Sequence, residues 1–423
     1  MIRKPIYLVI GLFTSLLIIT LFAMGVPTPV EFKVMNYQFW ANNQFTQAAP
    51  TTAIKPISKV SLKQDGTIAV NDKSFFPLGI YHNSQNSPDW FTTGKRRFND
   101  LQEIAKAGFN TIHPEIGGNY KSDELFLKES LRLGVYVLPN FSYNNRVAII
   151  SKHKNNPAIL GWDIADDVDH PNNKFTPAKI MKWHRETKQI DNNRLTYTSG
   201  SYLTKIEPFI HTSDIVGFQS YPIDYDPADK KPKPLRHGYY NYYSLLTAKL
   251  DNNGNPSEPI LDKRTIIANL QVFPWKNKPP NAHEVRNMTY SALINGVKGI
   301  LYFTYFDGKW DLPIHKDLWN GIKSLVPEIN ALTPVLLNGV LTKIDTKVDD
   351  LYAGQWTYKN SIYVVVLNTH PDNFIQASIE LPTQSKGSAK PLFSKRPKGM
   401  VYSNRKLTGM IQSGDVHVYK ISE

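Results

Sequence analysis

Cysteine is missing from all 423 residues of the chain. Its absence excludes disulfide bonds, thiolate metal sites, a cysteine nucleophile and a lipidated N-terminal cysteine. Two nucleotide-binding patterns, G-x-G-x-x-G and the Walker A sequence, are also absent, so a nucleotide cofactor has no support. His283 and Glu284 form an isolated pair without the H-E-x-x-H spacing of a zinc site. We therefore expect neither a cofactor nor a bound metal.

The composition is that of a folded, basic protein. Hydrophobic residues make up 41% of the chain and aromatic residues 12%, which argues against disorder. Lys and Arg number 49 against 36 acidic residues, for a net charge of +13. The basic residues are scattered and form no nucleic-acid-binding motif, so we expect no nucleic-acid partner. We interpret the charge first as a solvated surface, which would also suit an anionic envelope polymer or a membrane surface.

The N-terminus has the pattern of a membrane segment. Arg3 and Lys4 precede residues 6–24, which carry no charge. About 20 apolar residues span a bilayer, whereas the apolar core of a signal peptide has about 7 to 15. The pattern favours an uncleaved anchor within residues 1–30, with the rest of the chain periplasmic or extracellular. The alternative is cleavage near Ala23-Met-Gly25, which would release a secreted protein.

A linker and a hairpin follow. Residues 31–56 are rich in Pro, Thr, Gln, Asn and Ala, a composition typical of a linker. Residues 60–73 then alternate apolar and polar side chains around Asp65-Gly66, the strongest short hairpin signal. We expect this hairpin to lead directly into the main domain.

From residue 57 to residue 334, strand-like and helix-like segments alternate. The expected strands are residues 76–81, 110–113, 135–138, 158–164, 195–198, 214–218, 265–270 and 299–303. The expected helices are residues 98–108, 125–133, 147–153, 178–188, 240–250, 281–296 and 318–326, with a weak one between the fifth and sixth strands. Asn281 and Glu284 form a capping box at the start of one of them. Eight strands alternating with helices predict an α/β fold of the (β/α)8 TIM-barrel class.

Past Pro334 the pattern changes to short strands. Residues 335–339, 361–367, 377–381 and 416–421 have strand patterns, with Asn, Pro, Gly and Lys between them. Residues 335–423 therefore predict a small antiparallel β-sandwich appended to the barrel.

In such barrels the active site lies at the carboxyl ends of the strands. The residues that follow the expected strands are carboxylates, amides and aromatic rings, which is the mixture that a sugar site requires. Asp166 and Asp167, after the fourth strand, are the candidate catalytic residues. The candidate substrate-binding residues are His82, Glu115, Asn140, Tyr221, Gln271, Trp275, Tyr305 and Asp307. Asn83, Ser199, Asp224, Asp226 and Trp310 also follow strands, and Trp310 is a second candidate sugar platform beside Trp275.

The fourth strand carries a resemblance to known enzymes. Pro157-Ala-Ile-Leu-Gly-Trp-Asp-Ile-Ala-Asp-Asp167 resembles the Pro-Ala-Ile-x-Gly-Trp-x-x-x-(Asn/Asp)-Glu signature of clan A (β/α)8 glycoside hydrolases. Segments 107–113, 214–222 and 284–300 are similar to segments of the same enzymes, so the resemblance covers residues 60–332. It implies a carbohydrate ligand and hydrolysis of O-glycosyl bonds. Two positions depart from the family pattern: Asp167 stands where the acid/base Glu is expected, and Gln271 where the strand-seven nucleophile is expected.

Three functions remain open on these residues. The first is hydrolysis, either substrate-assisted, with Asp167 as the acid and Asp166 orienting a 2-acetamido group, or inverting, with Asp167 paired with Glu115, Asp224 or Asp307. The second is a carbohydrate-binding barrel without activity, because a glutamine cannot act as an ionised nucleophile. The third is a structural envelope protein.

Each candidate also has a plain structural explanation. For Asp166 and Asp167 the alternative is to cap the next turn or to pair with loop Lys and Arg residues, and for Glu115 it is a loop salt bridge. His82 is more often a hydrogen-bonded rim residue than a base. Trp162, on a strand, is expected in the core.

Overall fold

A computed structural model describes residues 54–89, 94–118, 120–223, 234–246, 249–250, 256–257, 265–275, 278–382, 387–396 and 399–422. The expected anchor within residues 1–30 and nearly all of the expected linker lie outside these residues. Asp224 and Asp226 lie outside them as well. Across the described ranges, we find no helix with the length and apolar character needed to cross a bilayer.

The expected hairpin is confirmed. Strand β1 (Val60–Leu62) pairs antiparallel with β2 (Ile68–Val70), and β2 pairs with β3 (Lys73–Ser74). Gly66 adopts a φ of 77°, a left-handed conformation that glycine enters without steric cost. The Asp65 carboxylate accepts hydrogen bonds from the N–H and hydroxyl groups of Thr67, so local chemistry fixes this turn.

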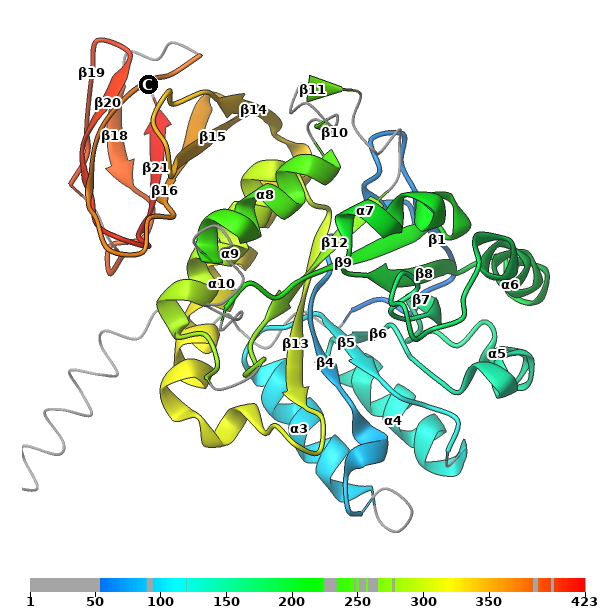
Figure 1. Cartoon of the computed structure of the whole chain (residues 1–423). Helices are drawn as coiled ribbons and strands as arrows, with labels where there is room; N and C mark the ends of the chain where they lie inside the picture. The colour runs from blue at the N-terminus through cyan, green and yellow to red at the C-terminus, as the bar shows by residue number, and fades with distance from the viewer. Residues whose placement is uncertain are drawn as a thin grey trace, which may run out of the picture. The chain divides into compact units, whose positions relative to one another are not determined.

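The eight expected barrel strands are also present (Figure 1). They are β4 (Leu78–His82), β5 (Thr111–Pro114), β6 (Tyr136–Val137), β7 (Gly161–Ala165), β8 (Leu195–Gly200), β9 (Ile215–Ser220), β12 (Thr265–Gln271) and β13 (Gly299–Phe306). Strands that follow one another in the chain pair in parallel, except β6 and β7, and β13 pairs with β4. Val137 N donates to Ala158 O at 2.8 Å and Leu160 N to Val137 O at 2.8 Å, which joins β6 to the chain entering β7. These bonds close the barrel.

Helices follow the strands around the barrel. They are α3 (Lys95–Lys106), α4 (Tyr120–Arg132), α5 (Arg146–His153), α6 (Pro177–Ile190), α7 (Leu203–Ile206), α8 (Pro234–Leu246), α9 (Ala282–Asn295) and α10 (Lys316–Asn338). Short 3-10 turns are η1 (Ser84–Asn86), η2 (Tyr143–Asn145), η3 (Glu207–Thr212) and η4 (Leu312–Ile314). The capping box of α9 is confirmed, since Asn281 and Glu284 each accept a bond from the main chain of the other.

Two helices end at points that change the predicted element that follows. Residues 335–338 belong to α10, so the strand expected at 335–339 is wrong. The buried face of this helix continues through Ile329, Leu332 and Val335, and this apolar contact outweighs the bonds lost at Pro327 and Pro334. The helix expected at 240–250 ends at Leu246 instead, and β10 (Lys249–Leu250) pairs with β11 (Pro256–Ser257).

The barrel interior combines apolar packing with a buried polar cluster. All residues of β4, β5, β7, β8 and β12 are buried, as expected of parallel strands covered on both faces. The hydroxyl groups of Tyr81 and Tyr197 lie 2.9 Å apart, and Asn269 Nδ2 donates to them at 3.0 and 2.7 Å. These bonds satisfy the polar groups that fill the barrel beneath its mouth. Trp162 is buried in the core, as predicted.

The C-terminal part forms two antiparallel sheets. One has the order β14–β15–β16–β21–β18 and the other β17–β20–β19. Their bounds are β14 (Val340–Ile344), β15 (Leu351–Tyr358), β16 (Ser361–Asn368), β17 (Ile375–Glu380), β18 (Ser388–Pro391), β19 (Val401–Ser403), β20 (Lys406–Ile411) and β21 (Val416–Ser422). Residues such as Val364 and Tyr419 of the first sheet share one apolar cluster with Ile379 and Leu407 of the second.

Candidate active site at the barrel mouth

A cleft of about 680 Å³ opens at the carboxyl ends of β4 to β7. Four of the candidates line it, namely Glu115, Asn140, Asp166 and Asp167. The loops after the same strands complete its walls with Gln85, Ile116, Gly117, Gly118, Phe141, Ser142, Tyr143, Asn144, Asn145, Ile149, Asn173 and Phe175. The parallel order of the strands explains this convergence, because their carboxyl ends meet at one end of the barrel.

The carboxyl group of Asp166 is held from several sides. Its Oδ1 accepts hydrogen bonds from the Ser199 hydroxyl, from Gln219 Nε2 at 3.1 Å and from the Asp167 main-chain N at 3.1 Å. The main-chain N of Asp166 donates to the Tyr143 hydroxyl at 2.7 Å. Three strands and one loop therefore fix this group at the end of β7.

Burial brings the pKa of Asp166 close to neutral pH. Burial first, and then the charges of Asp167 and Asp163, raise the pKa of Asp166 to about 7. Beneath it, Asp163 Oδ2 lies 3.0 Å from His113 Nε2, and both side chains are buried. Burial raises the pKa of Asp163 and lowers that of His113 to about 4, so the contact is a hydrogen bond and not an ion pair.

Asp167 occupies an unusual backbone conformation. Its φ is 51°, in the left-handed region that Asp and Asn enter more readily than other side chains. Its carbonyl accepts from Asn173 Nδ2 at 3.0 Å and its N donates to Ser199 Oγ at 3.3 Å. Main-chain bonds thus hold the residue, while its half-buried carboxyl group lines the cleft.

Glu115 contributes a third carboxyl group to the same cleft. The residue is 9% exposed. Burial raises its pKa to about 7, although two weak hydrogen bonds from Gln85 act to lower it. Gln85 N lies 3.3 Å from Oε2 and Gln85 Nε2 lies 3.4 Å from Oε1. Asn140 lies beside it, because Asn140 N donates to Pro114 O at 2.8 Å in a parallel bridge.

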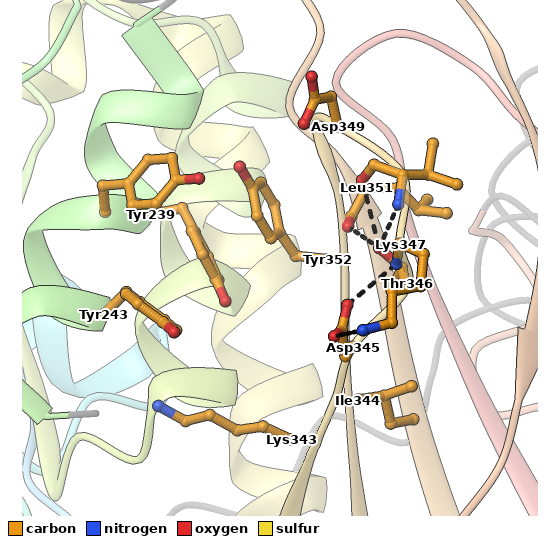
Figure 2. Close-up of a pocket in the computed structure, with 12 residues that line it drawn as sticks. Tyr239, Tyr243, Lys343, Ile344, Asp345, Thr346, Lys347, Asp349, Leu351 and Tyr352 are labelled. Carbon is orange, nitrogen blue, oxygen red and sulfur yellow. Dashed lines mark hydrogen bonds and ion pairs between the residues drawn. The ribbon is translucent and has the colours of Figure 1, made fainter. Parts of the chain in front are cut away.

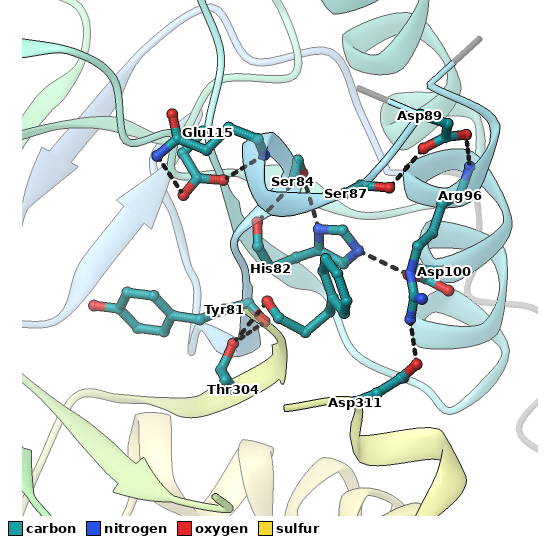
Figure 3. A network of polar contacts seen from close by, with 12 residues as sticks. Tyr81, His82, Ser84, Ser87, Asp89, Arg96, Asp100, Glu115, Thr304 and Asp311 are labelled. Carbon is teal, nitrogen blue, oxygen red and sulfur yellow. Dashed lines mark hydrogen bonds and ion pairs between the residues drawn. The ribbon is translucent and has the colours of Figure 1, made fainter. Parts of the chain in front are cut away.

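A chain of polar contacts runs from η1 to α3 and the loop after β13 (Figure 3). His82 Nδ1 lies 2.9 Å from Ser84 Oγ, and its Nε2 lies 2.8 Å from Asp100 Oδ2. Arg96 then bridges Asp100 and Asp311, at 3.1 and 2.8 Å. His82 is therefore a buried support for the η1 turn and does not line the cleft.

Aromatic rings cluster at the ends of β9, β12 and β13. The Tyr221 ring lies 5.1 Å from Phe273, 5.9 Å from Phe303 and 6.1 Å from Trp275, centre to centre. Trp275 is 50% exposed, as expected for a ring in a loop. Burial, followed by the charge of Asp166, raises the pKa of Tyr221, so this ring lies within electrostatic reach of the acids.

Gln271 ends β12 as expected, but its amide is turned into the protein. The side chain is fully buried. Its Oε1 accepts from Ile223 N at 2.8 Å, while its Nε2 donates to Ile223 O at 3.0 Å and to Phe273 O at 3.1 Å. Gln271 thus ties the loop after β9 to the loop after β12, and it does not line the cleft.

The remaining candidates also lie away from the cleft. Tyr305 is 1% exposed and packs edge-on against Trp319 at 5.3 Å. Asp307 Oδ1 accepts from two main-chain N–H groups of its own loop, at 2.9 and 2.6 Å. Trp310 is buried and stacks on His315 at 3.8 Å, so the expectation that it is an open sugar platform is wrong.

Several residues of the site were not among the candidates that the sequence indicated. Tyr143 and Phe175 lie in longer loops, beyond the first few residues after each strand. Gln219 lies within β9 rather than after it, and Phe273 and Phe303 were not singled out. Inspection of whole loops and of alternate strand positions would have found them. Within the described ranges, no group of three or more His, Asp or Glu side chains is arranged to hold a metal ion.

Comparisons with known proteins bear on the fold. No protein-family model matches the chain, and no curated protein matches it. Among solved structures, one described as a glycoside hydrolase has a TM-score of 0.56 and 13% identity, covering 86% of this chain and 97% of that one. A family 5 glycoside hydrolase from Bacteroides vulgatus has a TM-score of 0.56 and 15% identity, covering 86% and 93%. A GH30 endoxylanase from Clostridium papyrosolvens has a TM-score of 0.51 and 12% identity, covering 86% and 100%. The resemblance to (β/α)8 glycoside hydrolases is therefore confirmed for the fold.

Proposed function

We propose that the chain is a glycoside hydrolase whose substrate, an envelope or extracellular glycan, binds in the cleft lined by Glu115, Asp166 and Asp167. The observation that carries the proposal is the convergence of these three carboxyl groups on one cleft. Two of them, Asp166 and Glu115, have a pKa raised to about 7, which suits proton transfer near neutral pH. The fold of the chain, shared with solved glycoside hydrolases, supports the same activity.

The arrangement favours direct displacement by water. In this step a water oxygen attacks the anomeric carbon while the bond from that carbon to the glycosidic oxygen breaks. The leaving oxygen receives a proton from the acid pair Asp166 and Asp167, and Glu115 accepts a proton from the attacking water. Burial, followed by the charge of Asp167, raises the pKa of Asp166, so this residue supplies a protonated carboxyl group near neutral pH.

Gln271 argues against a covalent glycosyl–enzyme intermediate. An amide is not an ionised nucleophile, and this one is committed to three main-chain bonds. The carboxyl groups that remain for catalysis are those of the cleft. Rings such as Trp275 and Tyr221, at the opposite strands of the mouth, supply a platform for the apolar face of a sugar.

Hydrolysis can be tested with the full-length chain and a panel of aryl glycosides and envelope glycans, both with and without 2-acetamido groups. Asp167→Asn and Glu115→Gln are each expected to lower kcat at least about a hundredfold, the usual contribution of a general acid or base. Asp372→Asn, at an exposed site in the loop between β16 and β17, is the matched control and keeps full activity. Turnover unchanged in Asp167→Asn would overturn the assignment.

The stereochemistry of the first product distinguishes two mechanisms. Displacement by water inverts the anomeric centre, and NMR of the fresh product detects this directly. Retention, combined with activity on 2-acetamido sugars alone, would overturn the role of Glu115. It would instead support assistance by the substrate's own acetamido oxygen, with Asp166 orienting that group.

A carbohydrate-binding barrel without turnover is the second candidate function, and the buried amide of Gln271 is the observation that favours it. Saturable glycan binding without any product would support it. Binding weakened by Asp167→Asn would then assign the same cleft to recognition alone.

We also propose that the barrel acts outside the cytoplasm, held by the apolar residues 6–24 that follow Arg3 and Lys4. An alkaline phosphatase fusion at about residue 57 is expected to be active, because that enzyme folds only in an oxidising compartment. An inactive, stably produced fusion would contradict this location.

A further inference from the structure

A second cavity of about 530 Å³ lies between α8 and the β14–β15 region, apart from the barrel mouth (Figure 2). Tyr239, Tyr240 and Tyr243 come from α8, and Tyr352 from β15. Lys343, Ile344, Asp345, Thr346, Lys347, Val348, Asp349 and Leu351 complete the lining. None of these residues lines the cleft of the proposed active site.

Four tyrosine rings form one wall of this cavity. Tyr239 and Tyr352 stack with centroids 3.6 Å apart and an interplanar angle of 17°. Tyr243 lies 5.8 Å from Tyr239, and Tyr240 meets Tyr352 edge-on at 6.0 Å. Tyr240, Tyr243 and Tyr352 remain partly exposed. Packed tyrosines present an apolar surface edged with hydroxyl groups, which suits the faces and hydroxyls of a sugar ring.

Lys343 places a cation beside these rings. Its Nζ donates to Asn295 Oδ1 at 3.1 Å and lies 5.4 Å from the centre of the Tyr243 ring. Burial lowers its pKa to about 8. Within the part of the chain that the structure describes, no carboxylate lies within 4.0 Å of this ammonium group. A largely buried cation that lines a cavity without a counter-ion attracts an anion.

The acidic residues on the rim are already paired with other bases. Asp345 pairs with Lys347. Arg236 lies 3.9 Å from Asp349 and 3.7 Å from Asp350. Lys343 is the lining cation that lies beside the tyrosine rings.

We propose that this cavity binds an acidic saccharide, with the carboxylate of a uronic acid on Lys343 and the sugar ring against the tyrosines. A simple anion would make no use of the ring wall, and a neutral sugar would leave the ammonium group without an anionic partner. The site is independent of the cleft at the barrel mouth. It gives the chain a second contact with an anionic glycan, whether or not the cleft is catalytic.

Calorimetric titration of the full-length chain with a hexamer of galacturonic acid tests the proposal, with the methyl ester of the same hexamer as the uncharged match. The acid is expected to bind about tenfold more tightly than the ester, because one charge-assisted hydrogen bond contributes about that much to affinity. Lys343→Met should lower the affinity for the acid to that of the ester, and Tyr243→Leu should weaken both. Lys347→Met, on the rim, is the matched control.

Three results would overturn the site. They are no binding of the acid, equal binding of acid and ester, and binding unchanged in Lys343→Met. Thermal unfolding of each variant, together with Lys343→Arg as a charge-retaining variant, separates loss of the site from loss of the fold. Poly(glycerol phosphate) that binds in a Lys343-dependent manner while the uronate does not would assign the site to phosphate instead. The Asp167→Asn chain should bind the uronate as the parent does, so failure of hydrolysis and failure of this site are distinguishable.

Discussion

Gln271 ends β12 with both polar atoms of its amide bonded to the main chain. Gln271→Glu would place a carboxyl group where clan A enzymes have one. A carboxylate oxygen would then face the carbonyl oxygens of Ile223 and Phe273, and neither side of these contacts could donate a hydrogen bond. We expect the free energy of unfolding to fall by about 3 kcal/mol at pH 8, because the new charge is buried without a partner. We also expect no covalent glycosyl–enzyme intermediate by mass spectrometry of the trapped protein.

Urea denaturation at pH 8 and at pH 5 supplies the control for this variant. A protonated glutamic acid donates one hydrogen bond, so the loss should be smaller at pH 5. An equally stable variant that gains retaining activity would show that the loops around Gln271 rearrange.

The raised pKa of Glu115 predicts how the stability of the fold changes with pH. Its pKa is raised from the ordinary 4.5 to about 7, so between these values the folded chain binds more protons than the unfolded chain. Its contribution therefore destabilises the fold progressively as pH rises through this window. Glu115→Gln should increase the free energy of unfolding by about 2 kcal/mol at pH 8, after allowance for a weakened bond to Gln85, and the gain should vanish below about pH 4.5.

Denaturant unfolding of parent and variant across this pH range measures the effect. Glu103→Gln, at an exposed position on α3, should change stability by less than about 0.5 kcal/mol at every pH. A variant less stable than the parent at pH 8 would mean that Glu115 is ionised and well paired in the folded chain.

At the scale of elements, short-range chemistry was predictable from the sequence. The Asp65-Gly66 hairpin and the Asn281–Glu284 capping box each depend on residues within three positions, and both were identified before the fold was known. Asn281→Ala should lower the free energy of unfolding by about 1 kcal/mol, because the first turn of α9 loses an acceptor for an unpaired N–H group. Urea denaturation measures this, and Asn192→Ala in an exposed loop should have no comparable effect.

Other element boundaries depend on contacts that a sequence pattern does not contain. The sequence predicted a helix that ends at Val326 and a strand after Pro334, yet α10 continues to Asn338 because its apolar stripe is buried. Strand β13 extends to Phe306, three residues beyond the predicted end, and Tyr305 therefore packs outward against Trp319. Successive strand residues face opposite sides, so a small error in a strand end reverses the predicted direction of a side chain.

The same reasoning explains which site residues were found. Glu115, Asn140, Asp166 and Asp167 follow their strands closely, and the barrel topology alone brings them together. Gln271 is the last residue of its strand. Its side-chain amide points inward because it bonds to Ile223 in the loop after β9, and no local sequence pattern reveals this contact.

At the scale of the whole molecule, barrel and C-terminal sheets share one apolar cluster, to which Trp356 and Val418 contribute beside barrel residues. A buried ion-pair cluster crosses the same region. Glu328 of α10 pairs with Arg286 of α9 at 3.0 Å and with Arg396, and Arg286 Nη1 donates to Val416 O at 2.7 Å. The sequence predicted both parts but not these contacts, because their partners lie up to 130 residues apart.

Glu328→Gln should therefore lower the free energy of unfolding of barrel and C-terminal sheets together. We expect a loss of about 3 kcal/mol, since two arginines remain partly buried without their acid, and a single unfolding transition by far-UV circular dichroism and by fluorescence. Glu380→Gln, which removes an exposed partner of Arg405, should change little. Two separate transitions in the parent would show that barrel and sheets unfold independently.

The exposed ring of Trp275 gives the molecule an internal optical reporter. Half of its surface is open, whereas Trp162, Trp310, Trp319 and Trp356 are buried and Trp183 is half-buried. Among the tryptophans of the described ranges, water-soluble quenchers such as acrylamide should therefore act mainly on Trp275. A sugar stacked at the mouth should shield it and shift its emission to shorter wavelength, and Trp275→Phe should abolish the change. Because this signal needs no bond to break, it measures occupancy of the mouth in an enzyme and in a binding protein alike.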